Sequence, residues 1–433
     1  MTASASDLVI LGWLLLPALG AGIWIVLRTA ANPLHPIPVI AASFALLATA
    51  NLFWAESLGF YRLNLHGLGA IITGLASLAA GGAAATLAYR PVRPETTGRE
   101  DQDAFLEGGV FLAAGSILLL LCLLSNLFYW RDVAQTLGGL GTAARNPWLI
   151  KQAELSGRLD PYAAPYFFRN SILVPVALAL AAIKNPGRWL PRIMIALYAV
   201  TVLTNVRRDP MLIAAAALLG TAVVAVESPR RLILPLAAGA AVLLVVAVAL
   251  LRLLETSGLP LTTVLFGYTA GNLSSFQAVV DGYYPRVDAL PLEHTLYFFY
   301  SAAKYLDPGL APAPVIKPNP EVGLLPNTYS FLADYYLDMG PAGLVVVPFA
   351  VGVVASLSYS LAIRRPSFFS LCLFAAVYAA SARSWMNNDW SWLTIPTTAV
   401  YAAAAEVVLI APLKAIVRFL ASGAPGPAPE TVT

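Results

Sequence analysis

Residues 325–360 read LPNTYSFLADYYLDMGPAGLVVVPFAVGVVASLSYS. The second half of this stretch is an apolar run that begins near Pro341 and is long enough to cross about 30 Å of hydrocarbon as a helix. The first half carries tyrosines and acidic side chains up to Asp338, directly before the apolar run. Polar side chains so close to lipid are costly unless they face water or a ligand. The stretch therefore predicts a membrane helix with polar, functional residues at its entrance.

The composition of the whole chain indicates the same class. Of 433 residues, 59% are hydrophobic and only 11% are charged, whereas soluble domains carry about 25% charged residues. The mean hydropathy is +0.74. Apolar runs such as 242–251 do not alternate as the strands of a membrane β-barrel do. We therefore predict an all-α, polytopic integral membrane protein.

Charged or Pro/Gly-bearing breaks separate eleven predicted spans. These spans are 8–27, 37–54, 67–89, 105–127, 167–183, 190–206, 210–226, 232–252, 341–363, 367–382 and 392–413. The predicted organisation is eight N-terminal transmembrane helices (1–252), a large extracytoplasmic loop (253–340), three C-terminal transmembrane helices (341–413) and a disordered cytoplasmic tail (414–433).

The positions of Lys and Arg predict the orientation in the membrane. If the 253–340 loop lies outside, many of the chain's 26 basic residues are concentrated in the short connections on the inner side. This arrangement predicts an outside N-terminus and an inside C-terminus. The first apolar run, 8–27, lacks a basic segment before it, so we expect an uncleaved helix and not a signal peptide.

Several classes of protein are disfavoured. A net charge of +3 without a basic cluster argues against a nucleic-acid partner. The two cysteines, Cys122 and Cys372, lie in apolar runs, where packing is the expected role. The sequence has no nucleotide-binding glycine motif, no HExxH or Cys/His cluster and no GxSxG elbow. We therefore expect no cofactor and no metal.

The first candidate group for a site is the adjacent pair Arg207 and Arg208, which precede Asp209 in a tight turn between two spans. The simplest interpretation is a charged helix end whose side chains reach the interface. On the predicted outer side, however, positive charge opposes the usual orientation bias. Two neighbouring guanidinium groups also suit a phosphate or pyrophosphate, because each planar fork binds two oxygens and stays charged.

The second group lies between the last two predicted spans, at 381–390. Its tryptophans are typical of an aromatic belt at headgroup depth. Arg383, Asn388 and Asp389 add a cation, an amide and a carboxylate, which together with an aromatic face are the groups that bind sugars.

The third group is the polar stretch 327–338, with Asn327 and Tyr329 at its start. If its end is helical, Asp334 and Asp338 share one face at i, i+4 spacing. Interfacial tyrosines beside solvated carboxylates are the alternative interpretation. His294 in the large loop is one of only three histidines in the chain, although a lone loop histidine is more often incidental.

Three segments resemble the Wzy-type O-antigen polymerases, which join oligosaccharide repeat units. The TNVRRDP segment at 204–210 is similar to an arginine-bearing turn before a mid-chain span in that family. The GYTAGNLSSF segment at 267–276 looks like its Y-x-x-G-x-x-x-x-F element. The N-x-Y-x(5)-YYxDxGxxG pattern at 327–343 is the most specific of the three. In the arginine turn, a second arginine and Asp-Pro stand where a small residue is expected.

The resemblance implies a GT-C-like membrane glycosyltransferase in the bacterial cytoplasmic (inner) membrane. Such an enzyme transfers a glycan from undecaprenyl pyrophosphate to another lipid-linked repeat unit, in a pathway with a flippase and a chain-length regulator. By this resemblance Arg207, Arg208 and Arg383 would bind pyrophosphate, and Asp338 or His294 would be the general base. The residues expected to bind sugar are Asn327, Tyr329, Tyr335, Asn388 and Asp389.

Three rival functions remain, of which a scaffold in a polysaccharide assembly would leave the clustered arginines without a role. An O-antigen ligase-like enzyme uses the same donor with a different acceptor, and sequence separates the two poorly. A lipid-linked oligosaccharide flippase, or another transporter, is expected to have internal repeats and charges at mid-membrane depth. The predicted spans are nearly free of charge, which favours catalysis at the interface.

Overall fold

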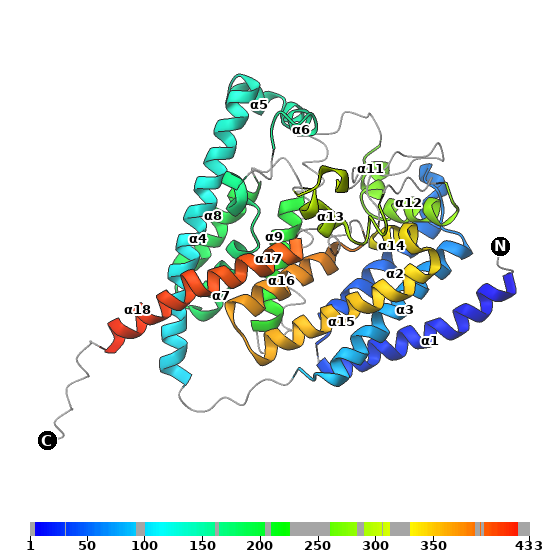
Figure 1. Ribbon diagram of the computed structural model, residues 1–433, viewed down its shortest axis with the longest axis horizontal. Coiled ribbons are helices and arrows are strands. Elements are labelled where there is room, and N and C mark those ends of the chain that lie inside the picture. Colours follow the sequence, from blue (N-terminus) through cyan, green and yellow to red (C-terminus); the bar gives the residue numbers. More distant parts are fainter. Residues whose placement is uncertain are drawn as a thin grey trace. The chain divides into compact units, whose positions relative to one another are not determined.

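The computed structural model describes eleven stretches of the chain. They are residues 5–30, 32–91, 100–160, 164–203, 209–225, 260–283, 290–304, 306–311, 330–385, 390 and 394–422. All regular elements within these ranges are helices, as predicted. Figure 1 shows their arrangement along the chain.

Among the residues that the structure describes, five helices are long and apolar enough to cross a membrane. They are Pro36–Trp54, Leu65–Ala88, Glu107–Leu137, Phe331–Arg364 and Ile395–Leu420. Five shorter apolar helices cover other predicted spans: Leu16–Ala30, Leu173–Lys184, Leu190–Leu203, Pro210–Ala225 and Phe368–Arg383. The predicted span 232–252 lies outside the described residues. The helices thus support a membrane protein with five candidate spans.

The chain divides into two compact units, which are built from residues distant in sequence. Unit 1 comprises Met1–Arg93, Glu227–Pro366 and Leu373–Thr397, and unit 2 comprises Pro94–Val226, Ser367–Cys372 and Thr398–Thr433. This division follows contacts in space, so it differs in kind from the linear segments predicted from the sequence. Two helices, α16 (Phe368–Arg383) and α17 (Thr394–Ala405), contribute residues to both units.

Unit 1 is built on a bundle of four helices (Figure 1). They are α1 (Ala5–Ala30), α2 (Pro36–Trp54), α3 (Leu65–Ala88) and α15 (Gly343–Arg364). Shorter elements complete the unit: η1 (Glu56–Leu58), α11 (Leu261–Gly267), α12 (Gly271–Val280), α13 (Tyr297–Ala303), η4 (Pro308–Leu310), α14 (Phe331–Met339) and η5 (Gly340–Ala342). Of these, α12 packs on α2, α3 and α14, near the end of the bundle where α2 ends and α3 and α15 begin.

Small residues allow α3 and α15 to pack with their backbones almost in contact. A methyl group on Gly352 would overlap the carbonyl oxygen of Leu78, and one on Gly81 would overlap that of Phe349. Membrane helices commonly pack through such small residues, because lipid provides no hydrophobic force between them. The Ser77 hydroxyl also donates to the Val345 carbonyl oxygen at 2.5 Å.

Replacing Gly352 with alanine is expected to destabilise unit 1 by about 1–3 kcal/mol, because the added methyl meets backbone that has no room to move. Thermal unfolding of the purified full-length protein in detergent measures this effect. The matched control is Gly20→Ala in α1, where nothing lies within 4 Å of the added carbon. Equal melting temperatures for the two variants would contradict the close packing of α3 on α15.

Unit 2 is organised around the 38-residue helix α4 (Glu100–Leu137). In the part of the chain that the structure describes, α4 contacts η2 (Ala164–Arg169), α5 (Leu140–Arg145), α6 (Pro147–Leu155), α7 (Leu173–Lys184), α8 (Leu190–Leu203), the π-helical turn η6 (Glu406–Ile410) and α18 (Ala411–Ser422). The helix α9 (Asp209–Ala225) packs on α7 and α8. A buried arginine, Arg169, lies 3.4 Å from the centre of the Tyr129 ring.

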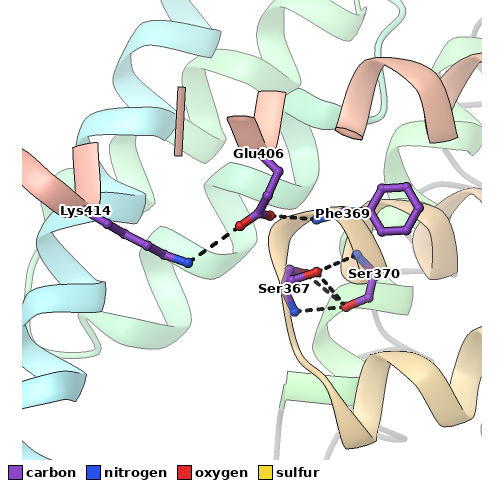
Figure 2. Close-up of polar contacts among 5 residues, drawn as sticks. All are labelled: Ser367, Phe369, Ser370, Glu406 and Lys414. Carbon is purple, nitrogen blue, oxygen red and sulfur yellow. Dashed lines mark hydrogen bonds and ion pairs between the residues drawn. The ribbon is translucent and has the colours of Figure 1, made fainter. Parts of the chain in front are cut away.

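A carboxylate connects the C-terminal helices of unit 2 to the start of α16 (Figure 2). Glu406 accepts the Phe369 amide at 3.0 Å and lies 3.6 Å from the ammonium group of Lys414. Ser367 and Ser370 bond to each other's amides, as in a capping box. These contacts satisfy the amides at the start of α16, which otherwise lack partners.

Two predictions made from the sequence have clear outcomes in the fold. The condition on which Asp334 and Asp338 share a face, a helix just before Gly340, is met, because α14 covers Phe331–Met339. Residues 414–422 were predicted to be a disordered tail, and this is wrong, since they are helical in α18. The basic Lys414 and Arg418 lie one turn apart among apolar residues, a pattern that favours an amphipathic helix.

Candidate functional site

Two segments far apart in the sequence meet at the start of α14. The Phe331 amide donates to the Ser384 carbonyl oxygen at 2.9 Å, which joins the start of α14 to the end of α16. Ser330 directly precedes α14 and is fully buried, and its hydroxyl has no hydrogen-bond partner among the described residues. The second and third candidate groups from the sequence are therefore neighbours in unit 1.

Arg383 is the last residue of α16 and lies beside this junction. Only 3% of its surface is exposed, so its guanidinium is held within the protein and does not extend into solvent. The indole of Trp385 donates to the Ala382 carbonyl oxygen at 2.9 Å, and both Trp385 and Trp390 pack against the core of unit 1. The tryptophans therefore have a packing role here.

Asp338 holds the loop that contains His294. Its two carboxylate oxygens accept the backbone amides of His294 at 3.2 Å and Thr295 at 2.6 Å. Hydrogen bonds to an ionised acceptor are about twice as strong as neutral ones. Because both oxygens are engaged in this way, Asp338 is suited to positioning the loop more than to accepting a proton.

The loop brings His294 to a second carboxylate one turn earlier in α14. His294 Nδ1 lies 3.9 Å from an oxygen of Asp334, and the two side chains are 20% and 18% exposed. This contact is longer than a hydrogen bond, but a histidine beside a carboxylate is a pairing that general bases commonly use. Sequence reasoning noted that Asp334 and Asp338 share a face, but it missed the pairing with His294.

The backbone of this loop is tightly turned. Leu292 has a φ of 52°, which makes it the one non-glycine residue with positive φ among those that the structure describes. For a residue with a branched side chain this conformation is unfavourable, and it persists where neighbouring contacts impose it. Those contacts include the Leu296 amide bonded to the Leu292 carbonyl at 2.8 Å and the Tyr300 hydroxyl bonded to the Pro291 carbonyl at 2.8 Å.

The structure places Tyr335, which the sequence predicted to line a sugar pocket, in the core of unit 1. It is 1% exposed and packs edge-on against Phe331, with ring centres 5.6 Å apart. The reason is the helical period: Phe331 and Tyr335 lie at i, i+4 on the buried face of α14, whereas Asp334 and Asp338 lie on another face.

Six of the predicted site residues lie outside the described residues. They are Arg207, Arg208, Asn327, Tyr329, Asn388 and Asp389. The structure therefore describes the cation Arg383 and the Asp338–His294 region of the predicted site. Within the described ranges, no group of three or more His, Cys, Asp or Glu side chains is arranged to hold a metal ion.

Replacing Asp338 with asparagine is expected to loosen the 290–296 loop. The amide group of asparagine presents a donor to one of the two backbone N–H groups, so about 1.5–3 kcal/mol of charge-assisted hydrogen bonding is reduced or lost. Hydrogen exchange at the His294 and Thr295 amides should become at least 10-fold faster. Asp307→Asn, which caps η4 elsewhere in unit 1, is the control. Unchanged exchange in Asp338→Asn would contradict the positioning role.

Comparisons with protein-family models, with curated proteins and with solved structures found no match to this chain.

Proposed function

We propose that this protein is a membrane glycosyltransferase that joins oligosaccharide repeat units carried on undecaprenyl pyrophosphate. The reaction takes place at the outer face of the bacterial cytoplasmic membrane. The proposed topology has eleven spans, an outside N-terminus, an inside C-terminus and a GT-C-like architecture. The proposal is supported by the sequence resemblance at 327–343 and by the apolar helices of the described part of the chain.

One observation carries the proposal: the hydrogen bond from the Phe331 amide to the Ser384 carbonyl oxygen. It joins the segment that carries a buried cation, Arg383, to the helix that carries Asp334 and Asp338. A cation and a carboxylate-oriented histidine near one helix start are what transfer from a pyrophosphate donor requires. Along α14, Asp338 lies about 10 Å from Phe331, a distance comparable to one sugar and its leaving group.

The proposed chemistry is substitution at the anomeric carbon of the donor glycan. A hydroxyl oxygen of the acceptor sugar forms a bond to that carbon while the bond from carbon to the pyrophosphate oxygen breaks. Undecaprenyl pyrophosphate leaves with the bonding electrons, and the acceptor proton passes to His294. Each well-placed donor on the leaving group lowers the barrier by about 2.7–4 kcal/mol, and a general base contributes roughly 10²–10⁴-fold.

The residues have distinct proposed roles. Arg383, with Arg207 and Arg208, stabilises the negative charge that grows on pyrophosphate. His294 accepts the proton, and Asp334 orients its imidazole. Asp338 fixes the loop, while Asn327, Tyr329, Asn388 and Asp389 bind sugar hydroxyls. Because pyrophosphate is already a good leaving group, neither a nucleotide nor a metal is required for this chemistry.

Reconstitution tests the proposal directly. The purified full-length protein in lipid nanodiscs would receive lipid-linked repeat units as its only substrate. We expect a ladder of glycans at multiples of one repeat unit and release of undecaprenyl pyrophosphate. Transfer that occurs only after addition of lipid A–core acceptor would instead identify a ligase. Absence of any glycosyl transfer under both conditions would overturn the proposal.

A further inference from the structure

A second polar and aromatic cluster lies in unit 1, outside the residues assigned to catalysis. It is formed by the connection between α2 and α3 and by the end of α12. Tyr61 and Tyr283 contact each other edge to face, with ring centres 5.8 Å apart and planes at 88°. Tyr283 is 47% exposed, so one aromatic surface faces outward. We call Tyr61, Asn64, Asp281 and Tyr283 the tyrosine patch.

The carboxylate of Asp281 lies at the centre of the tyrosine patch and is held by neutral donors. The Tyr61 hydroxyl donates to it at 2.7 Å, and the Asn64 amide nitrogen lies 3.3 Å from both of its oxygens. Desolvation, with the hydrogen bond and charge of Asp281, raises the pKa of Tyr61, so this hydroxyl remains a donor at neutral pH. A carboxylate offers about four acceptor positions, so Asp281 retains capacity for a ligand hydroxyl.

The backbone beneath the tyrosine patch is fixed on both sides. At the end of α12, Gly282 has a φ of 78°. The backbone amides of Gly282 and Tyr283 donate hydrogen bonds to the carbonyl oxygens of Val279 and Ala278, respectively. This is a helix end that a residue with a side chain adopts poorly. On the other side, the Asn64 side-chain oxygen caps α3, and the Asn64 backbone N–H donates to the side-chain oxygen of the fully buried Gln277 at 2.9 Å. Such rigidity favours binding, because little conformational freedom is lost.

The patch lies just beyond the end of a candidate span. Phe53 and Trp54, the last residues of α2, are strongly exposed, as expected of a belt at the membrane interface. Tyr61 and Asn64 follow within ten residues, at the end of the bundle where α14 leads into α15. The patch and the α14 carboxylates Asp334 and Asp338 therefore belong to the same end of unit 1.

We infer that the tyrosine patch binds a sugar residue of the glycan chain, as a subsite apart from the reacting centre. An exposed aromatic face suits the C–H surface of a sugar ring, and the preorganised carboxylate suits its hydroxyls. The negative charge of Asp281 disfavours phosphate groups, which argues against a lipid headgroup as the occupant. The identity of the ligand as a glycan rests on the proposed function, whereas the binding geometry does not.

Binding of a soluble probe tests this inference without requiring catalysis. The probe is the oligosaccharide released by acid hydrolysis from the lipid-linked repeat unit of the bacterium that encodes the protein. Saturation-transfer NMR on the full-length protein in nanodiscs measures its affinity. We expect Tyr283→Ala and Asp281→Asn each to weaken binding at least 10-fold. Phe299→Ala, which removes an exposed aromatic ring from α13, should leave binding unchanged.

The outcomes separate the subsite from the proposed function. If neither the wild-type protein nor the variants bind the probe, or if both patch variants bind as tightly as wild type, the subsite is overturned. If the wild-type protein makes polymer and Tyr283→Ala binds the probe normally, the proposed function stands and the subsite falls. If binding depends on the patch but no transfer occurs, the subsite stands and the proposed function falls. Tyr61→Phe keeps the aromatic ring, so it provides a second test if the alanine variant misfolds. It should also show weakened binding.

Discussion

Replacing Arg383 with alanine is expected to lower the rate of repeat-unit joining by about 100- to 1,000-fold. The guanidinium is buried at the end of α16, next to the start of α14, so it is positioned before the substrate arrives. If the buried guanidinium contacts the leaving pyrophosphate as proposed, it stabilises that group more strongly than it would in solution. Initial rates of undecaprenyl pyrophosphate release in nanodiscs provide the measurement.

Two further variants give the Arg383 experiment its control. Arg383→Lys should be intermediate, because an ammonium group keeps the charge but cannot bind two phosphate oxygens through one planar fork. Arg364→Ala removes an equally permanent charge from the far end of α15 and should retain the wild-type rate. A normal rate in Arg383→Ala, with the melting temperature of the wild-type protein, would remove this residue from the proposed site.

The helices could be predicted from the sequence where an apolar run is bounded by polar residues. The polar approach and the apolar run at 325–360 correctly indicated a helix, α14, leading into the long helix α15. The disordered tail failed for a physical reason, since α18 alternates basic and apolar residues at helical spacing. The composition alone did not reveal this helix, because the segment beyond residue 422 is rich in Pro and Ala and disorder was predicted for the whole tail.

The candidate site was less predictable, because its geometry depends on contacts between distant segments. Sequence spacing put Asp334 and Asp338 on one face of the helix. It could not predict that Asp338 accepts the His294 and Thr295 amides, whereas Asp334 lies beside the His294 side chain. The burial of Tyr335 was not predictable, because a tyrosine near polar residues has the same sequence pattern whether its ring is buried or exposed. The i, i+4 spacing of Phe331 and Tyr335 is the sequence feature that places both rings on one face of the helix.

Replacing His294 with glutamine is expected to lower the turnover rate by roughly 10²–10⁴-fold with little change in donor affinity. The Asp338 clamp on the His294 and Thr295 amides remains in this variant, so the loop keeps its position and the loss reports the imidazole alone.

Asp334 allows the role of His294 to be separated from a purely structural one. Asp334→Asn keeps the shape of the partner but removes the charge that orients the imidazole, so its loss of turnover should be smaller than that of His294→Gln. The double variant should be no slower than His294→Gln, since residues that act as one unit are not additive. His66→Gln at the start of α3 is the matched control and should retain the wild-type rate. If the two losses multiply instead, His294 and Asp334 act independently, and the proton must pass to another group.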